Sequence, residues 1–237
     1  MVTMLAAAGI PTVVVARRAD RLTELQQRYG CIEVLVADLQ TPDGVAAVEA
    51  RIVDTERPID LVVNNAGFGT SGPFHESRIE RLADEVALNV VALTRLSHAA
   101  LRTMIPRGRG YLLNVSSMVS FQPAPSLAVY TATKAYVTSL TESLQLEARG
   151  TGVTVTALCP GLTRTEFQSI SSSESYAGQY PAFLWTSVDL VARCGLDGVA
   201  EGKVLAIPGW QYRLMGIVVG ALPRRAVRWL SGRVQRT

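Results

Sequence analysis

Short runs of Val, Leu and Ile alternate along this chain with longer segments whose apolar residues recur at helical spacing. The runs predict strands at residues 12–16, 33–37, 60–64, 110–115, 153–158 and 203–207. The segments between them predict helices at residues 18–29, 41–56, 82–105, 129–148 and 187–199. Strands joined by helices pair in parallel, and the helices then cover both faces of the sheet. The sequence therefore predicts an α/β fold with a doubly wound parallel sheet in a single domain.

Composition supports one aliphatic core and no metal or disulfide framework. Of the 237 residues, 48% are apolar but only 6% aromatic, which suits aliphatic strands covered by helices. Cys31, Cys159 and Cys194 are odd in number and share no ligand spacing, so we expect free thiols in a reducing compartment. The N-terminus has no basic leader, and no uncharged apolar stretch reaches the roughly 20 residues of a membrane span. We expect a cytoplasmic protein.

Charge is distributed unevenly along the chain. The net charge is +3, but no acid follows Glu201. The seven cations beyond that point are Lys203, Arg213, Arg224, Arg225, Arg228, Arg233 and Arg236, so residues 1–201 sum to −4 (+3 minus 7). This basic end is either solvated or attracted to an anionic partner, such as a phospholipid face or an acyl carrier; we expect no nucleic acid partner.

The last residues predict a helix outside the main domain. We divide the chain into a domain at residues 1–208 and a basic helical extension at residues 209–237. Pro223 can start an amphipathic helix with Ala226, Val227, Leu230 and Val234 on one side. Such a helix could cover a pocket, contact a neighbouring subunit or lie on a membrane. Of these we favour subunit packing, in a homodimer or homotetramer.

A glycine motif in the first half of the chain is misleading. Residues 67–72 read Gly-Phe-Gly-Thr-Ser-Gly and follow a predicted strand, as a dinucleotide fingerprint does. That fingerprint needs a helix directly after its third glycine, whereas Pro73 and Phe74 follow here. We interpret residues 67–72 as a loop in which the glycines let a ligand approach the backbone.

Tyr130 and Lys134 have the spacing Tyr-x-x-x-Lys and follow Ser117 by 13 residues. A phenol, an ammonium and a hydroxyl together can polarise a carbonyl group. A free tyrosine has a pKa near 10, and we expect the neighbouring ammonium to lower it. Alone, the pair is a weak signal, because most such pairs are neighbours on one exposed helix face.

Other segments give the pair a context. Asn64-Asn65-Ala66-Gly67 ends a predicted strand, Asn89 lies in the long helix, and residues 160–165 read Pro-Gly-Leu-Thr-Arg-Thr. In this order and at these intervals the chain resembles the short-chain dehydrogenase/reductase family from about Met1 to Pro208. The resemblance implies a Rossmann-type fold and an NAD(P)(H)-dependent interconversion of a ketone, or a 3-oxoacyl group, with a secondary alcohol.

The resemblance also implies roles for individual residues. Tyr130 would be the general acid/base, and Lys134 would stabilise its phenolate and bind the nicotinamide ribose. Ser117 would hydrogen-bond the substrate carbonyl, and Asn89 would position a water in the proton path. Further cofactor contacts are implied at Asp38, Leu39, Asn65, Ala66, Gly67, Pro160, Gly161 and Thr165.

Arg17 predicts the choice of cofactor. Sites that take NAD usually place an acid at the end of this strand, whereas an arginine suits a 2′-phosphate. The strand at residues 12–16 is followed by Arg17 and Arg18, with no acid before Asp20. We therefore expect NADP(H) rather than NAD(H), unless Arg17 is only a surface charge.

Three features leave alternatives open. In relatives, a strand and a Thr-Gly-x-x-x-Gly-x-Gly loop precede the segment matching residues 1–9, so we expect about 20 to 30 further upstream residues. A rival hypothesis is a non-catalytic homologue that binds a partner; an epimerase or dehydratase is a weaker one.

Met118 and Val119 depart from the small residues usual after Ser117. Residues 167–183 would shape a pocket for an apolar substrate or serve in packing.

Overall fold

The computed structural model describes residues 1–165, 167, 171 and 181–234. Its strands are all paired in parallel, in the order β3-β4-β5-β6 in one sheet and β1-β2 in a second. Their bounds are Thr12–Ala16 for β1, Ile32–Val36 for β2, Leu61–Asn64 for β3, Gly110–Val115 for β4, Val153–Leu158 for β5 and Leu205–Ala206 for β6. The predicted α/β fold with parallel strands is confirmed.

The two sheets share one hydrophobic core. Among the described residues β1 pairs only with β2, and no bridge joins β1 to β3. Val15 and Leu35 nevertheless pack against the cluster that contains Leu112 of β4 and Val155 of β5. The chain is therefore a single domain, as predicted. The further upstream strand expected from the sequence stays a prediction.

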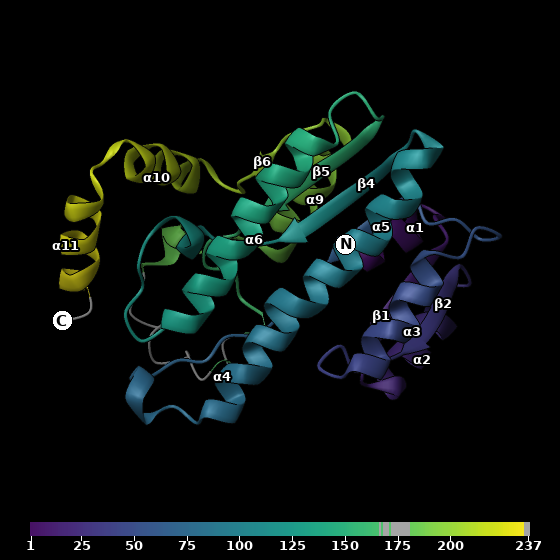
Figure 1. Ribbon diagram of the computed structural model, residues 1–237, viewed down its shortest axis with the longest axis horizontal. Coiled ribbons are helices and arrows are strands. Elements are labelled where there is room, and N and C mark those ends of the chain that lie inside the picture. The colour runs from purple at the N-terminus through teal and green to yellow at the C-terminus, as the bar shows by residue number, and fades with distance from the viewer. Residues whose placement is uncertain (166, 168–170, 172–180, 235–237) are drawn as a thin grey trace.

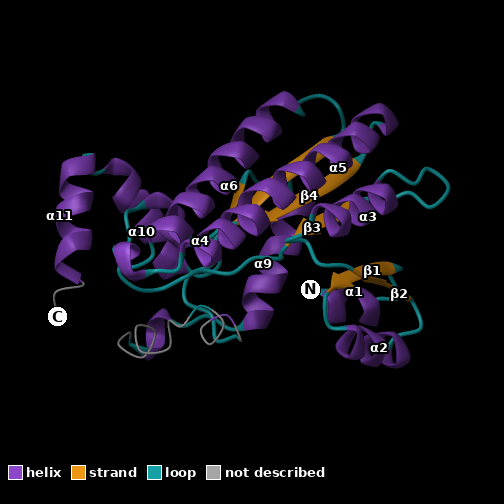
Figure 2. Ribbon diagram, turned by 60° about the horizontal axis from the view of Figure 1, so that its bottom comes forward, coloured by secondary structure: helices purple, strands orange, loops and turns teal. Residues whose placement is uncertain are grey.

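Helices cover both faces of the larger sheet, as Figures 1 and 2 show. On one face lie α3 (Pro42–Ile52), α5 (Leu93–Arg107) and α6 (Ala128–Glu147); on the other lies α9 (Val188–Ala200). Successive strand residues point to opposite faces, so Leu112 joins the core under α5 while Leu113 packs with Val199 of α9. The helices α1 (Val2–Ala7) and α2 (Ala19–Arg28) pack on the β1-β2 sheet.

The long helix predicted at residues 82–105 is three consecutive segments. It consists of α4 (Ile79–Val86), a π-helical turn η2 (Ala87–Ala92) and α5. A π turn is wider than an α turn and shifts the direction of its side chains. The apolar spacing does not reveal it, because residues on both sides remain helical. Asn89 lies in this turn and is buried.

The loop at residues 65–73 leads into a 3-10 turn, η1 (Phe74–Glu76), and the next α-helix begins at Ile79. No α-helix follows Gly72 directly, so residues 67–72 form a loop and not a dinucleotide fingerprint, as predicted. Two further 3-10 turns are η3 (Met118–Phe121) and η4 (Ala182–Leu184).

The C-terminal extension contains two helices, α10 (Trp210–Ala221) and α11 (Arg224–Val234). The second begins after Pro223, as predicted, but the first was missed. Apart from Gln211 and Arg213, its residues are apolar, aromatic or glycine, so it lacks the continuous polar face that marks an amphipathic helix in a sequence. Figures 1 and 2 place the two helices at the end of the molecule opposite β1 and β2.

No helix among the described residues is long and apolar enough to cross a membrane. In the same part of the chain, no group of His, Cys, Asp and Glu could hold a metal ion, and all three cysteines are free.

Candidate active site

A buried polar network fixes the ends of β3 and β4 beneath the candidate site. Asn64 Nδ2 donates hydrogen bonds to Ser97 Oγ at 3.0 Å and to Asn114 Oδ1 at 2.9 Å. Asn114 Nδ2 in turn donates to Thr141 Oγ1 at 3.0 Å. These residues belong to β3, α5, β4 and α6, so the network joins both strands to both helices. A satisfied network of this kind fixes a unique arrangement of elements. Sequence reasoning missed it, because each residue is a polar exception within an apolar pattern.

Asn89 holds the loop that follows β3. Its Nδ2 donates to the Phe68 carbonyl oxygen at 2.8 Å and to Thr133 Oγ1 at 3.1 Å, while its Oδ1 accepts from the Phe68 amide at 3.2 Å. A β-carbon on Gly67 would lie 2.9 Å from Asn89 Oδ1 and 3.5 Å from Lys134 Nζ. The structure thus brings three of the predicted residues, Gly67, Asn89 and Lys134, together. Asn65 and Ala66 precede them and are exposed.

Tyr130 and Lys134 project from α6 toward this loop. Both are buried, and Lys134 Nζ lies 5.8 Å from the centre of the Tyr130 ring. Lys134 Nζ donates a hydrogen bond to the Val115 carbonyl oxygen at 2.7 Å. The Tyr130 ring also contacts Phe167 at a centroid distance of 5.3 Å, and a β-carbon on Gly69 would lie 3.1 Å from it. Gly69 therefore leaves room for the phenol.

Burial dominates the titration of this pair. It raises the pKa of Tyr130 to about 12, partly opposed by a hydrogen bond with Ser117, while the nearby Glu85 carboxyl adds to the rise. Burial also lowers the pKa of Lys134 to about 8. Each group is pushed toward its neutral form, because a charge loses its hydration inside the protein. The expected lowering of the Tyr130 pKa is not found in this state, because burial raises that pKa.

Ser117 lies at the end of β4, where η3 begins. Its Oγ accepts a hydrogen bond from the Val119 amide at 3.3 Å and contacts the Pro160 carbonyl oxygen at 3.5 Å. Its hydrogen bond to Tyr130 places the hydroxyl and the phenol on one side of the site. The predicted trio of Ser117, Tyr130 and Lys134 is thus assembled.

Glu85 is a site residue that sequence reasoning missed. It lies one turn before Asn89, is fully buried, and neither carboxylate oxygen has a hydrogen-bond partner among the described residues. Burial raises its pKa, with Thr70 and the Arg81 charge opposing the rise. Electrostatic interaction links it to both Tyr130 and Lys134. In the sequence it reads as an ordinary helical acid, and only the buried contacts of α4 with α6 distinguish it.

Arg17 and Asp38 form a second polar group at the ends of β1 and β2. Arg17 Nη1 lies 2.9 Å from Gln40 Oε1, to which it donates, and 3.8 Å from Asp38 Oδ2. The Arg17 side chain is 65% exposed, so its guanidinium remains accessible to a ligand. Asp38 Oδ1 accepts from the Gln40 amide at 3.0 Å, whereas the neighbouring Leu39 packs against the core.

The segment at residues 160–165 is held by Tyr212 of α10. A β-carbon on Gly161 would overlap the Tyr212 ring, so only glycine fits there. Tyr212 Oη accepts from the Leu162 amide at 2.9 Å and donates to the Leu184 carbonyl oxygen at 2.6 Å. Thr165 is exposed, and its Oγ1 accepts from the Phe167 amide at 3.2 Å. Of residues 167–183, expected to shape a pocket or serve in packing, 168–170 and 172–180 lie outside the described residues.

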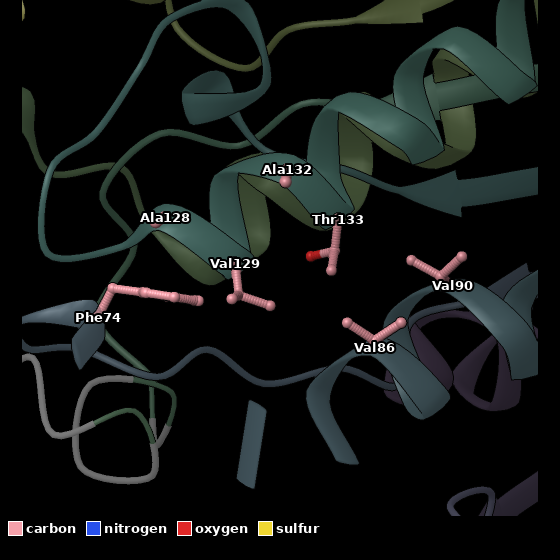
Figure 3. Close-up of a pocket in the computed structure, with 7 residues that line it drawn as sticks. All are labelled: Phe74, Val86, Val90, Ala128, Val129, Ala132 and Thr133. Carbon is pink, nitrogen blue, oxygen red and sulfur yellow. The ribbon is translucent and has the colours of Figure 1, made fainter. Parts of the chain in front are cut away.

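An apolar hollow of about 390 Å³ lies on the outer side of α6, between α6 and the π turn. Figure 3 shows the side chains that line it: Phe74, Val86, Val90, Ala128, Val129, Ala132 and Thr133. Tyr130 and Lys134 do not line it, so this hollow is separate from the assembled polar groups.

Comparison with known proteins identifies similar proteins. A family profile described as short chain dehydrogenase matches residues 1–175. An uncharacterised oxidoreductase of Mycobacterium tuberculosis is 32% identical over 235 residues, covering 96% of this chain and 90% of its own. A short-chain dehydrogenase from Sphingobium yanoikuyae in complex with NADPH superposes with a TM-score of 0.80 at 32% identity, covering 92% of this chain and 87% of its own.

A bulky-bulky ketone specific alcohol dehydrogenase from Comamonas testosteroni superposes with a TM-score of 0.74 at 27% identity, covering 93% of this chain and 88% of its own. The parallel α/β fold and these similarities place the protein among the oxidoreductases. The chain belongs to the short-chain dehydrogenase family.

Proposed function

We propose that this protein is an NADPH-dependent reductase of apolar ketones or 3-oxoacyl groups, able to run in reverse as a secondary alcohol dehydrogenase. The convergence of buried Tyr130 with Lys134, 5.8 Å from its ring, and with Ser117 carries the proposal. Reduction of a ketone requires a proton at oxygen and a hydride at carbon. The protein must supply the proton from a group that holds it at neutral pH.

Tyr130 meets that requirement. With its pKa at about 12, the phenol is protonated at neutral pH and available as an acid. Ser117 would hydrogen-bond the substrate oxygen and align it with the phenol. When Tyr130 gives up its proton, the Lys134 ammonium stabilises the phenolate. Because the Lys134 pKa is about 8, this ammonium can also return a proton to Tyr130.

The chain's own residues fit a phosphorylated nicotinamide cofactor. Gly67 leaves a space that a β-carbon would fill, beside Asn89 and Lys134, and Arg17 offers an accessible guanidinium suited to a 2′-phosphate. Asp38, Pro160, Gly161 and Thr165 would add contacts. NADPH, when bound, supplies the hydride. The Sphingobium relative in complex with NADPH and the ketone-specific Comamonas relative support this assignment.

We also propose a cytoplasmic homo-oligomer, in which a second subunit covers the hollow beside α6. Phe74 is 62% exposed and Val86 40% exposed at this hollow, and Val91 nearby is 51% exposed. Apolar surface of this kind is typical of subunit contacts. The free thiols suit a reducing compartment.

The test measures binding and turnover separately. NADPH should raise the melting temperature of the purified chain more than NADH does at equal concentration, and NADPH should be consumed on addition of an aryl ketone such as propiophenone. A melting temperature unaffected by NADPH would favour the rival, a homologue that binds a partner without catalysis. If NADPH binds but none of a panel of ketones and 3-oxoacyl thioesters is reduced, the proposed substrate class is refuted, whereas the proposed cofactor is not.

A further inference from the structure

The outer face of α10 is an uncovered apolar stripe. Trp210, Leu214, Ile217 and Val218 are 75%, 54%, 70% and 47% exposed. They occupy positions i, i+4, i+7 and i+8, so they form one continuous line along the helix. We call these four residues the apolar stripe. Soluble surfaces rarely expose a line of large apolar side chains that no other element covers.

The opposite side of α10 is fixed to the body of the protein. Tyr212 is buried in a cluster with Met118 and Cys159, against which Met215 packs. The Tyr212 hydroxyl bonds to both Leu162 and Leu184. Helix α10 therefore cannot rotate to bury the apolar stripe without breaking these contacts. Its cover must come from outside the described residues.

The charge next to the apolar stripe indicates what that cover is. Helix α11 follows after Leu222 and Pro223, and its Arg224, Arg225 and Arg228 are exposed. Residues 202–237 contain seven cations and no acid. Trp229 and Leu230, 57% and 46% exposed, interleave with the arginines. Exposed apolar and aromatic side chains beside clustered arginines are the signature of a surface that binds anionic lipid.

A second copy is a poorer fit to this surface. In a two-fold symmetric contact the same patch faces itself, so the arginines of two α11 helices would repel. An anionic bilayer neutralises them and accepts the apolar side chains at its interface. Figure 1 shows α10 and α11 at one end of the molecule, with α11 projecting from the body. A flat surface can therefore reach both helices.

We infer that the α10–α11 pair docks the protein on anionic lipid bilayers, with the apolar stripe inserted among the acyl chains and Arg224, Arg225 and Arg228 at the headgroups. Through Tyr212 this surface is joined to the segment at residues 160–165. An apolar molecule dissolved in the bilayer would thus be held close to the candidate active site.

The test is co-sedimentation of the full chain with vesicles of phosphatidylcholine alone and of phosphatidylcholine mixed with phosphatidylglycerol. We expect binding only to the mixed vesicles, weakened by added salt. The Arg224→Gln, Arg225→Gln, Arg228→Gln triple variant should bind roughly a hundredfold more weakly, from about 1 kcal/mol per arginine. The Trp210→Ser, Ile217→Ser double variant should lose binding.

Matched control variants make the same kinds of substitution at exposed residues outside α10 and α11. Arg102→Gln, Arg149→Gln, Arg193→Gln removes three exposed arginines outside α11, and Ile79→Ser, Leu146→Ser removes two exposed apolar residues outside α10. Both should bind as the unchanged protein does. The test needs neither NADPH nor substrate, so its failure leaves the proposed function standing.

Three outcomes would overturn the inference. The first is no binding to the mixed vesicles. The second is binding that the stripe and arginine variants leave unchanged while circular dichroism shows them folded. The third is a dimer in solution that the Trp210→Ser, Ile217→Ser variant dissociates without any vesicle binding, which would assign the apolar stripe to a second copy.

Discussion

Lys134 Nζ lies 5.8 Å from the centre of the Tyr130 ring, one turn along the same helix, and donates a hydrogen bond to the Val115 carbonyl oxygen. Burial moves the two pKa values apart, from 10.0 to about 12 for the phenol and from 10.5 to about 8 for the ammonium. Both groups are therefore protonated at neutral pH. In this state Tyr130 and Lys134 can donate a proton but cannot accept one.

Lys134→Met should raise the free energy of unfolding at neutral pH by up to about 3 kcal/mol, the equivalent of the Lys134 pKa shift. The unfolded chain binds more protons than the folded chain between pH about 8 and about 10.5, so stability rises with pH across that window. The gain in the free energy of unfolding from Lys134→Met should therefore shrink as the pH rises through this window. Urea unfolding at neutral pH and near pH 10 measures it, and a loss of stability at neutral pH would show that the Val115 hydrogen bond outweighs desolvation.

Glu85→Gln should stabilise the protein increasingly as pH rises. The folded-state pKa of Glu85 is raised, so the folded chain holds a proton that the unfolded chain has lost, and stability falls as pH climbs through the folded pKa. The amide has the same shape and does not ionise. Urea unfolding at pH about 5 and about 8 should show the difference; the matched change Asp84→Asn, at an exposed neighbour, should show none. Equal effects of both changes would contradict the raised pKa of the buried Glu85 carboxyl.

Arg17→Ser should weaken NADPH binding by roughly 10- to 100-fold, the magnitude of a charge-assisted hydrogen bond, and leave NADH binding nearly unchanged. Titration calorimetry with both cofactors measures this. Arg28→Ser, at an exposed arginine of α2, is the control. If Arg17→Ser weakens both cofactors equally, Arg17 does not read the 2′-phosphate.

Gly161→Ala should destabilise the protein by about 1 to 3 kcal/mol, because its β-carbon would overlap the Tyr212 ring. Gly30→Ala is the control, since a β-carbon there meets nothing within 4 Å. Adding Tyr212→Ala to Gly161→Ala should remove much of the overlap penalty, as a double-mutant cycle in thermal unfolding would show. If the stability losses of Gly161→Ala and Tyr212→Ala simply add, the Gly161 β-carbon and the Tyr212 ring are not in contact.

Much of the fold could be read from the sequence, because strands and helices have distinct apolar periods. The strands at residues 12–16, 110–115 and 153–158 match the predicted bounds. The π turn around Asn89 could not, since the segments on both sides of it remain helical. Helix α10 was missed because its exposed side is as apolar as its buried side.

The sequence predicted that three side chains of the candidate site would lie together, but it did not predict the electrostatics of the site. Tyr130, Lys134 and Ser117 are brought together as the spacing indicated, whereas the direction of the Tyr130 pKa shift depends on burial that no spacing records. Glu85 and the Asn64–Asn114 network were missed for the same reason. Polar residues inside a core are defined by contacts between distant elements.

The most direct measurement compares Tyr130→Phe with Tyr111→Phe, a control at the half-exposed Tyr111 of β4, in the rate of NADPH consumption with an aryl ketone. The loss of one hydroxyl at Tyr130 should lower kcat by roughly 10² to 10⁴, the usual share of general acid catalysis, while the melting temperature shows that both variants stay folded. Tyr111→Phe should be as active as the unchanged protein. Turnover by Tyr130→Phe at the rate of the unchanged protein would contradict the assignment of the proton donor.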